Sequence, residues 1–446
     1  GGLTSDRVGR SRPGRRPGLD ARMAATLARI GPRADESQDR SRRRHPKEAA
    51  RALTKSGRIE VWDLKEGVAI RTTSWVGSIR LGGLQIDVRP KIQGLALDRI
   101  LRYALGRKAL DGGVHVSTAL GSHGLVELLV LQLVEEARVL VRGGLRRGYV
   151  SRAEDLLFPR GRIDFHRWAS LPRASGAGLP CRFHERSSNV LQNQALLAGL
   201  RLGAQLCAGL GAGWEAAETA RLLDAEVEEV RLSPEMFDRL IREGTRMTRA
   251  YDPALFLVQM LAEGVSAASD TNDKSARVRG FLIDMNVIFQ ALLGRFLTEE
   301  LVDKHVSLEP HITGFFTWDD DAGRTPPFLK PDFVVKQGRT VVGLLDAKYR
   351  DLSDGDVPAG WLYQLAIYAL SRPEDEREAV ILYPTLASSV KERTLRIRTT
   401  GAPHASVRVR PVPIADLAEV LAATDGPGRS KRRALAEQLA SRGTAS

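Results

Sequence analysis

Residues 329–335 read Leu-Lys-Pro-Asp-Phe-Val-Val, and residues 341–349 read Val-Val-Gly-Leu-Leu-Asp-Ala-Lys-Tyr. Valine-rich runs of this length, separated by the short polar stretch 336–339, predict a β-hairpin. Asp346 and Lys348 are two residues apart, so on a strand their side chains leave the same face. Pairing of the two runs would bring Asp332 near Asp346. Two clustered carboxylates form a hard oxygen site for Mg²⁺, and a lysine beside them can position or deprotonate a water. The pattern therefore predicts a metal-dependent phosphodiesterase.

A helix is predicted just after the hairpin, where residues 361–368 read Trp-Leu-Tyr-Gln-Leu-Ala-Ile-Tyr. Gln364 and Tyr368 are four residues apart and therefore share one helix face. The Asp-x-Lys triplet alone carries little information, because it recurs at residues 63–65, where we expect a surface turn. The whole combination resembles the PD-(D/E)xK nuclease superfamily, and the Gln-x-x-x-Tyr helix resembles its RecB-like branch.

The composition indicates a protein without membrane spans and with a polyanionic partner. The 446 residues suffice for two or three domains, and the net charge is +13. Residues 1–51 hold 13 Arg and 1 Lys against 4 Asp and 2 Glu, a net +8, so most of the excess lies in an N-terminal arm. No apolar run reaches membrane-spanning length and no secretory signal is visible, so we expect a cytoplasmic protein. The two cysteines, Cys181 and Cys207, are expected to be reduced core residues.

The pattern along the chain predicts a multidomain α+β protein. A disordered basic arm is expected over residues 1–45, and a small β-rich domain for partner docking over 46–123. A helical middle domain is expected over 124–268, with a linker near 269–275. An α/β nuclease domain with a mixed central sheet follows over 276–423, including a strand-rich segment at 306–318. Residues 424–446 are expected to form a frayed basic tail.

Two glycine- and arginine-rich stretches, residues 142–150 and 158–165, need separate consideration. The first could form a phosphate loop, but it lacks the Walker pattern and a strand-then-helix context. Nucleotide binding by this chain is therefore rejected. Contacts to a phosphate backbone, contacts to an acidic partner, and a solvated connector all remain open.

A closer resemblance comes from the order of several segments. Residues 281–286 read Phe-Leu-Ile-Asp-Met-Asn and lead a helix. Together with residues 88–92, with Tyr149 and residues 158–165, and with residues 189–200, they resemble the McrC family over about residues 50–420. McrC is the nuclease subunit of McrBC-type modification-dependent restriction systems. The resemblance implies DNA cleavage only in complex with McrB, a GTP-hydrolysing AAA+ ring. The N-terminal half of McrC docks in that ring and stimulates its GTPase, and McrB generally recognises the methylated cytosine.

The resemblance also assigns roles by motif match. Mg²⁺ is the implied cofactor, with Mn²⁺ as a substitute, and double-stranded methylated DNA is the implied substrate. The metal ligands would be Asp332, Asp346 and the backbone carbonyl of Ala347, the catalytic lysine would be Lys348, and Gln364 and Tyr368 would support the site and the DNA strand.

One departure from the family pattern concerns the first nuclease helix, which in this branch often carries a glutamate near the position of Gln290. A glutamine offers a neutral oxygen, so if Gln290 faces the site, we expect weak or one-metal occupancy. An assembly and GTPase-activating subunit with a weak or inactive nuclease is therefore an alternative. A stand-alone RecB-like repair nuclease is another, although it leaves the large N-terminal half without an explanation.

Overall fold

A computed structural model describes most of the chain. The described residues are 59–64, 67–81, 84–90, 95–105, 122–170, 178–269, 278–319, 324–353, 355–387, 389–398, 404–423 and 425–441. The expected basic arm at 1–45 and most of the expected linker at 269–275 lie outside these residues.

The N-terminal strands form two small sheets. β1 (Ile59–Leu64) pairs antiparallel with β2 (Gly67–Thr72). β3 (Trp75–Leu81) lies between β4 (Leu84–Val88) and β8 (Val278–Asp284), and both pairings are antiparallel. The β-rich character predicted here is confirmed. The third strand of the second sheet, however, comes from some 200 residues further along the chain, directly before the first helix of the C-terminal part. A boundary at residue 276 would therefore cut through this sheet.

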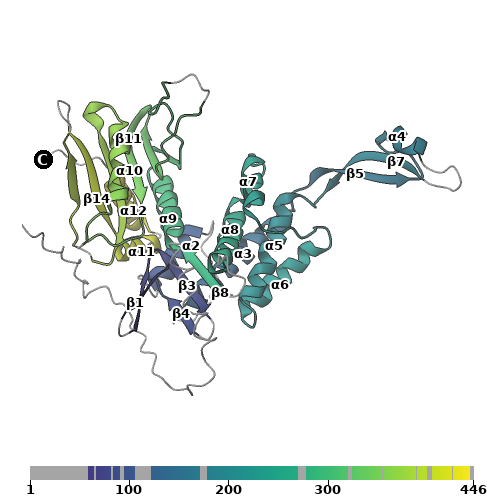
Figure 1. Cartoon of the computed structure of the whole chain (residues 1–446), viewed down its shortest axis with the longest axis horizontal. Helices are drawn as coiled ribbons and strands as arrows, with labels where there is room; N and C mark the ends of the chain where they lie inside the picture. The colour runs from purple at the N-terminus through teal and green to yellow at the C-terminus, as the bar shows by residue number, and fades with distance from the viewer. Residues whose placement is uncertain are drawn as a thin grey trace, which may run out of the picture.

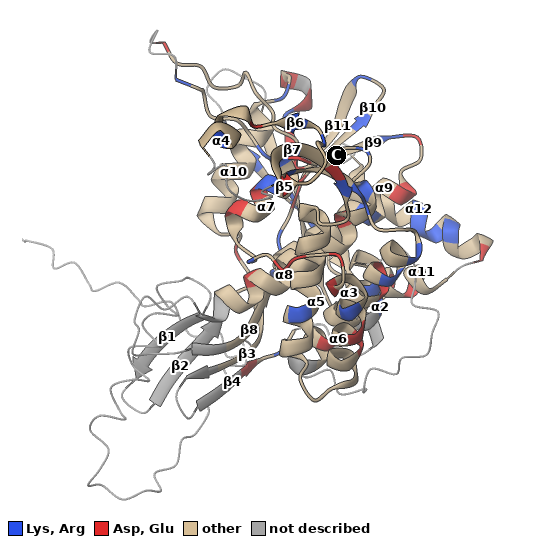
Figure 2. Ribbon diagram, turned by 90° about the vertical axis from the view of Figure 1, so that its right-hand side faces the viewer, with Lys and Arg blue, Asp and Glu red and all other residues tan. Residues whose placement is uncertain are grey.

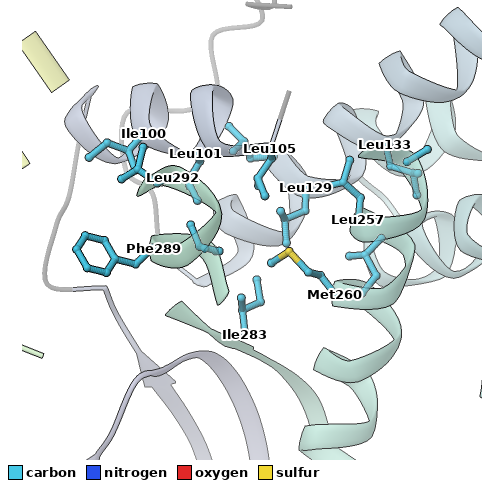
Figure 3. Packing of buried hydrophobic residues seen from close by; sticks show 14 of the residues in the cluster. Ile100, Leu101, Leu105, Leu129, Leu133, Leu257, Met260, Ile283, Phe289 and Leu292 are labelled. Carbon is cyan, nitrogen blue, oxygen red and sulfur yellow. The ribbon is translucent and has the colours of Figure 1, made fainter. Parts of the chain in front are cut away.

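A helical body follows, and it shares one core with the C-terminal part. Leu101 of one helix, Leu129 and Leu257 of two others and Phe289 of a fourth belong to a single buried cluster (Figure 3). Residues 125–134 and 192–200 are buried on nearly all sides of their helices, whereas Pro234–Arg242 buries one face, through Met236, Phe237 and Leu240. The helices are α2 (Leu95–Leu105), α3 (Ser122–Arg142), α5 (Leu191–Leu206), α6 (Gly211–Asp224), α7 (Pro234–Arg242), α8 (Asp252–Ser269) and α9 (Met285–Glu300).

A long arm projects from this body, and it was not predicted. β5 (Gly148–Leu156) pairs antiparallel with β7 (Leu179–Ser187), and the short β6 (Arg162–Ile163) pairs with the other edge of β7. The helix α4 (Phe165–Ser170) lies at the far end (Figure 1). The expectation of a mainly helical middle region is therefore wrong for the strand residues 148–156, 162–163 and 179–187.

The C-terminal part is built on a six-stranded mixed sheet in the order β13-β14-β12-β11-β10-β9. β11, β12 and β14 are parallel, and the other neighbours are antiparallel. After α9 the described residues form three strands, a helix, three more strands and two helices, and the mixed central sheet agrees with the prediction. The strands are β9 (His305–Leu308), β10 (Phe333–Gln337), β11 (Thr340–Ala347), β12 (Glu378–Thr385), β13 (Arg393–Ile397) and β14 (Ala405–Pro413).

Helices cover both faces of this sheet. On one face, α10 (Ala359–Leu370) buries Leu365 and Ala369 against Val334 and Leu344. On the other face, α9, α11 (Ile414–Ala422) and α12 (Gly426–Ala440) pack against the core that is shared with the helical body. Alternate residues of the central strands β10, β11 and β12 therefore enter two different cores, and both cores fix the register of these strands.

Two expectations about the C-terminal part are wrong. Residues 426–440 are not a frayed tail, because they form α12, capped by Asp425, with Leu439 buried (Figure 2). Its Lys and Arg residues, blue in the ribbon of Figure 2, explain why this stretch of sequence resembles a solvated tail. Residues 306–318 are not rich in strands, because after β9 only an isolated bridge joins Ile312 to Leu329. In the described part of the chain, no helix is long and apolar enough to cross a bilayer.

Candidate active site

The β10–β11 hairpin brings the predicted carboxylates together. Phe333 lies opposite Leu345 in the antiparallel register, so Asp332 enters the sheet beside Asp346. The turn is closed by Gly338, whose φ of 61° is readily reached only without a Cβ. Val334 and Leu344 point into the core beneath α10. By the period of two along a strand, Asp332, Asp346 and Lys348 lie on that same face.

Asp346 is an acid buried at the end of β11. Its side chain is 1% exposed, and Oδ2 lies 2.7 Å from Nζ of Lys348. Oδ2 accepts no hydrogen bond of normal geometry from the described residues. Burial raises the pKa of this carboxyl, and the lysine charge opposes that rise. A buried carboxylate oxygen with a cation beside it but no aligned donor is well placed to bind a metal ion.

Asp332 is held against the end of the same strand. Its Oδ2 accepts a 2.6 Å hydrogen bond from the backbone N–H of Ala347. Burial, and then the charge of Asp346, raise the pKa of Asp332 to about 7. The Ala347 N–H and Lys348 oppose this rise, whereas Glu309 adds to it. Two neighbouring buried carboxyl groups repel each other when both are ionised. A bound divalent cation would reduce this repulsion.

Gln364 and Tyr368 of α10 form hydrogen bonds at the segment that directly precedes Asp332. The Tyr368 hydroxyl donates to the carbonyl of Lys330 at 2.8 Å and accepts from Nε2 of Gln364 at 2.9 Å. Burial, and then the charge of Asp346, raise the pKa of Tyr368 to about 12. The helix pair therefore anchors the backbone two residues before Asp332, and the supporting role in the site that the resemblance implied for this pair stays a prediction.

A second anchor was missed by the sequence analysis. Oδ1 of Asn286, in the first turn of α9, accepts a 2.8 Å hydrogen bond from the N–H of Tyr349. The rings of Phe289 and Tyr349 also pack edge to face. These contacts fix the chain directly after Lys348. The only hint in the sequence was Asn286 itself, at the end of the segment that resembles McrC.

Gln290 is turned toward Glu309, an acid that the sequence analysis did not select. Nε2 of Gln290 donates to Oε1 of Glu309 at 2.9 Å, and Lys330 forms an ion pair with Oε2. The N–H of Glu309 donates to the carbonyl of Asp332 at 2.8 Å. The structure therefore places Gln290 at the rim of the site, on a carboxylate from the loop after β9.

The donor set fits Mg²⁺. This ion is commonly bound by one or two carboxylates while it keeps several waters. Asp332 and Asp346 supply two carboxylates, and the unaligned Oδ2 of Asp346 is the observation that favours a cation there. No group of three or more His, Cys, Asp or Glu residues with metal-binding geometry occurs among residues that the structure describes. The site is therefore sparse in protein ligands and leaves room for water.

The chain is similar to solved structures and matches a protein-family model. No curated protein matches the chain. Among solved structures, the chain is similar to a half-complex from the tetradecameric assembly of Thermococcus gammatolerans McrB AAA+ hexamers with bound McrC. That match has 20% identity and a TM-score of 0.47, and it covers 90% of this chain and 89% of the other. A second match is the Thermococcus gammatolerans McrBC complex, with 20% identity, a TM-score of 0.37, and 53% and 69% coverage.

The family model provides the decisive comparison. The model described as the McrBC 5-methylcytosine restriction system component matches residues 70–384. This range contains the N-terminal sheet with β8, the helical body, the arm, and all of the carboxylates and the lysine at the end of the β10–β11 hairpin. The chain therefore belongs to the McrBC 5-methylcytosine restriction system component family.

Proposed function

We propose that this chain is the nuclease subunit of a modification-dependent restriction system. It would cut DNA by Mg²⁺-assisted phosphodiester hydrolysis, with a PD-(D/E)xK site, in complex with a McrB-like AAA+ GTPase ring. The observation that carries the proposal is the position of Asp332, Asp346 and Lys348 at adjoining strand ends, with one acid bonded to the Ala347 N–H and the other 2.7 Å from the lysine.

Each residue of the site has a distinct task in this proposal. Asp332 and Asp346 hold the cation, which supplies charge stabilisation at the phosphate and a more acidic water. Lys348 orients the attacking water or neutralises the negative charge that develops on the phosphate. Its Nζ lies 5.8 Å from the centre of the Trp361 ring, so α10 limits where the ammonium can move. Tyr368 and Gln364 fix the backbone segment that precedes Asp332 and do not bind the DNA in this proposal.

The projecting arm supports the assembly part of the proposal. Its exposed apolar side chains are Tyr149, Leu157, Phe158, Phe165 and Trp168, with Phe158 82% exposed. Exposed apolar groups on a projecting extension mark a protein-interaction surface. The surface that docks in the ring would therefore include the described arm residues 148–170 and 178–187, beyond the β-rich residues 46–123 that the sequence analysis favoured.

The test is cleavage of a methylated plasmid by the chain with its ring partner, GTP and Mg²⁺. Asp346→Asn should abolish cutting and leave GTPase stimulation intact. Asp303→Asn is a matched control, because Asp303 is an exposed acid paired with Arg433 in the same part of the chain. Cutting by Asp346→Asn at the normal rate would reject the assignment.

The second candidate is an assembly and GTPase-activating subunit with a weak nuclease. Gln290 favours it, because a neutral amide faces the rim of the site and no third carboxylate joins the two aspartates in a metal-binding group within the described residues. Faster GTP turnover by the ring, with no Lys348-dependent nicks in the plasmid, would select this candidate.

A further inference from the structure

Glu309 has an unusual backbone conformation. Its φ is 45°, and it is alone among the non-glycine residues that the structure describes in having a positive φ. A residue with a Cβ is strained in such a region, and it remains there only when its surroundings hold it. The position directly follows β9 and lies beside Asp332.

Contacts to two separate segments, the helix α9 and residues 330–332, hold Glu309 in this conformation. Its N–H bonds the Asp332 carbonyl at 2.8 Å, and its Oε1 accepts from Gln290 of α9 at 2.9 Å. Its Oε2 pairs with Lys330, which lies in the segment that Tyr368 anchors. Both carboxylate oxygens and the backbone are therefore tied to groups around the candidate cation site.

An ordinary surface ion pair does not account for this arrangement. An exposed Lys–Glu pair contributes too little to stability to offset the backbone strain. An alternative residue at this position, such as glycine, would adopt φ 45° without strain. The strained glutamate is better explained if its charge is needed beside Asp332.

We propose that Glu309 is a positioning residue of the cation site, which supplies a third negative charge and fixes the backbone of Asp332, while Gln290 orients its carboxylate. The inference rests on the proposed function, because it requires Asp332 and Asp346 to hold a divalent cation. Glu309 acts on the bound cation through its charge and through Asp332. A neutral Gln290 suits this role, since a second carboxylate there would repel Glu309.

The test is calorimetric titration of the full chain with Mn²⁺ at pH 8, without DNA or partner. Glu309→Gln keeps the side-chain shape and should weaken Mn²⁺ binding about tenfold, or about 1.4 kcal/mol. Glu437→Gln is the matched control and should bind normally. Glu437 is also paired with a lysine, Lys304, and its side chain is 40% exposed against 47% for Glu309.

A charge transposition gives a second readout. The double variant Gln290→Glu with Glu309→Gln returns the charge to the same hydrogen-bonded pair, and it should recover at least threefold of the lost affinity. If Glu309→Gln destabilises the fold, Glu309→Gly replaces it, because glycine accepts the backbone conformation. The glycine variant should also bind about tenfold more weakly.

The outcomes separate this inference from the proposed function. Normal Mn²⁺ affinity in the Glu309 variants, with binding abolished in Asp346→Asn, overturns the inference and leaves the proposed function standing. Normal affinity in Asp346→Asn overturns both. A tenfold loss in the Glu309 variants without any recovery by transposition overturns the role given to Gln290.

Discussion

Replacing Asp332 with Asn should stabilise the protein in the absence of metal. The pKa of this carboxyl rises from an ordinary 3.8 to about 7 in the folded chain, chiefly because it is buried and lies near Asp346. Asparagine keeps an oxygen that can accept the hydrogen bond from Ala347 N–H, and it removes the ionisable group. The gain in the free energy of unfolding should therefore depend on pH.

The sign follows from proton linkage. Between about pH 4 and 7 the folded chain keeps a proton on Asp332 that the unfolded chain releases, so stability falls as pH rises through this window. A rise of about 3 pKa units corresponds to about 4 kcal/mol, which is the upper bound of the destabilisation above pH 7. Asp332→Asn should remove this loss, with little effect at pH 4 and a gain of about 1–4 kcal/mol at pH 8.

The assay is urea unfolding in EDTA at pH 5, 6, 7 and 8. The transition that is measured is the unfolding of the C-terminal part of the chain. The unfolding free energy of the wild type should fall with pH across this range, and that of Asp332→Asn should fall less. Mg²⁺ should stabilise the wild type at pH 8 and leave the variant unchanged, because the cation binds only the intact site. A variant that is less stable than the wild type at pH 8, or equally dependent on pH, would refute the reasoning.

Three further predictions concern the same site and the arm. Lys348→Met should lower partner-dependent plasmid cutting at least a hundredfold, with unchanged GTPase stimulation, as measured in parallel nicking and phosphate-release assays. Tyr368→Phe should destabilise the chain by about 1–3 kcal/mol and slow cutting, because Gln364 and the Lys330 carbonyl lose their partner. Tyr363→Phe, at a 70% exposed position of the same helix, should do neither in the same melts and assays. Phe158→Ser with Phe165→Ser should leave the melting temperature unchanged and weaken binding to the ring at least tenfold by sedimentation, whereas Trp214→Ser, exposed on α6, should bind normally.

The central hairpin and the helix after it were predictable because neighbouring residues in the sequence determine both elements. An apolar run that ends in Asp346-Ala347-Lys348 defines both a strand and the face on which its polar groups lie. The four-residue spacing of Gln364 and Tyr368 likewise places both on one helix face, and the structure shows them bonded to each other. The roles assigned to these residues in catalysis stay predictions.

Features that depend on distant partners could not be predicted in this way. The arm strands β5 and β7 carry many polar side chains, and Cys181 and Phe183 are buried apolar side chains of β7, so the alternation of their exposure is hard to recognise from residue type. The helix α12 is rich in Arg and Lys, and it becomes ordered because Leu439 is buried and Arg432 and Arg433 pair with Glu300 and Asp303. Glu309 was missed because no sequence rule assigns a positive φ to a glutamate.

The pairing of β8 with β3 has a consequence for biosynthesis. The second N-terminal sheet stays incomplete until residue 284 has left the ribosome, because its outer strand is translated after the helical body and the arm. Until then β3 has an unpaired edge, which is a template for association with another nascent chain. A fragment that ends before residue 278 should therefore aggregate, whereas one that extends past Asp284 should close this edge.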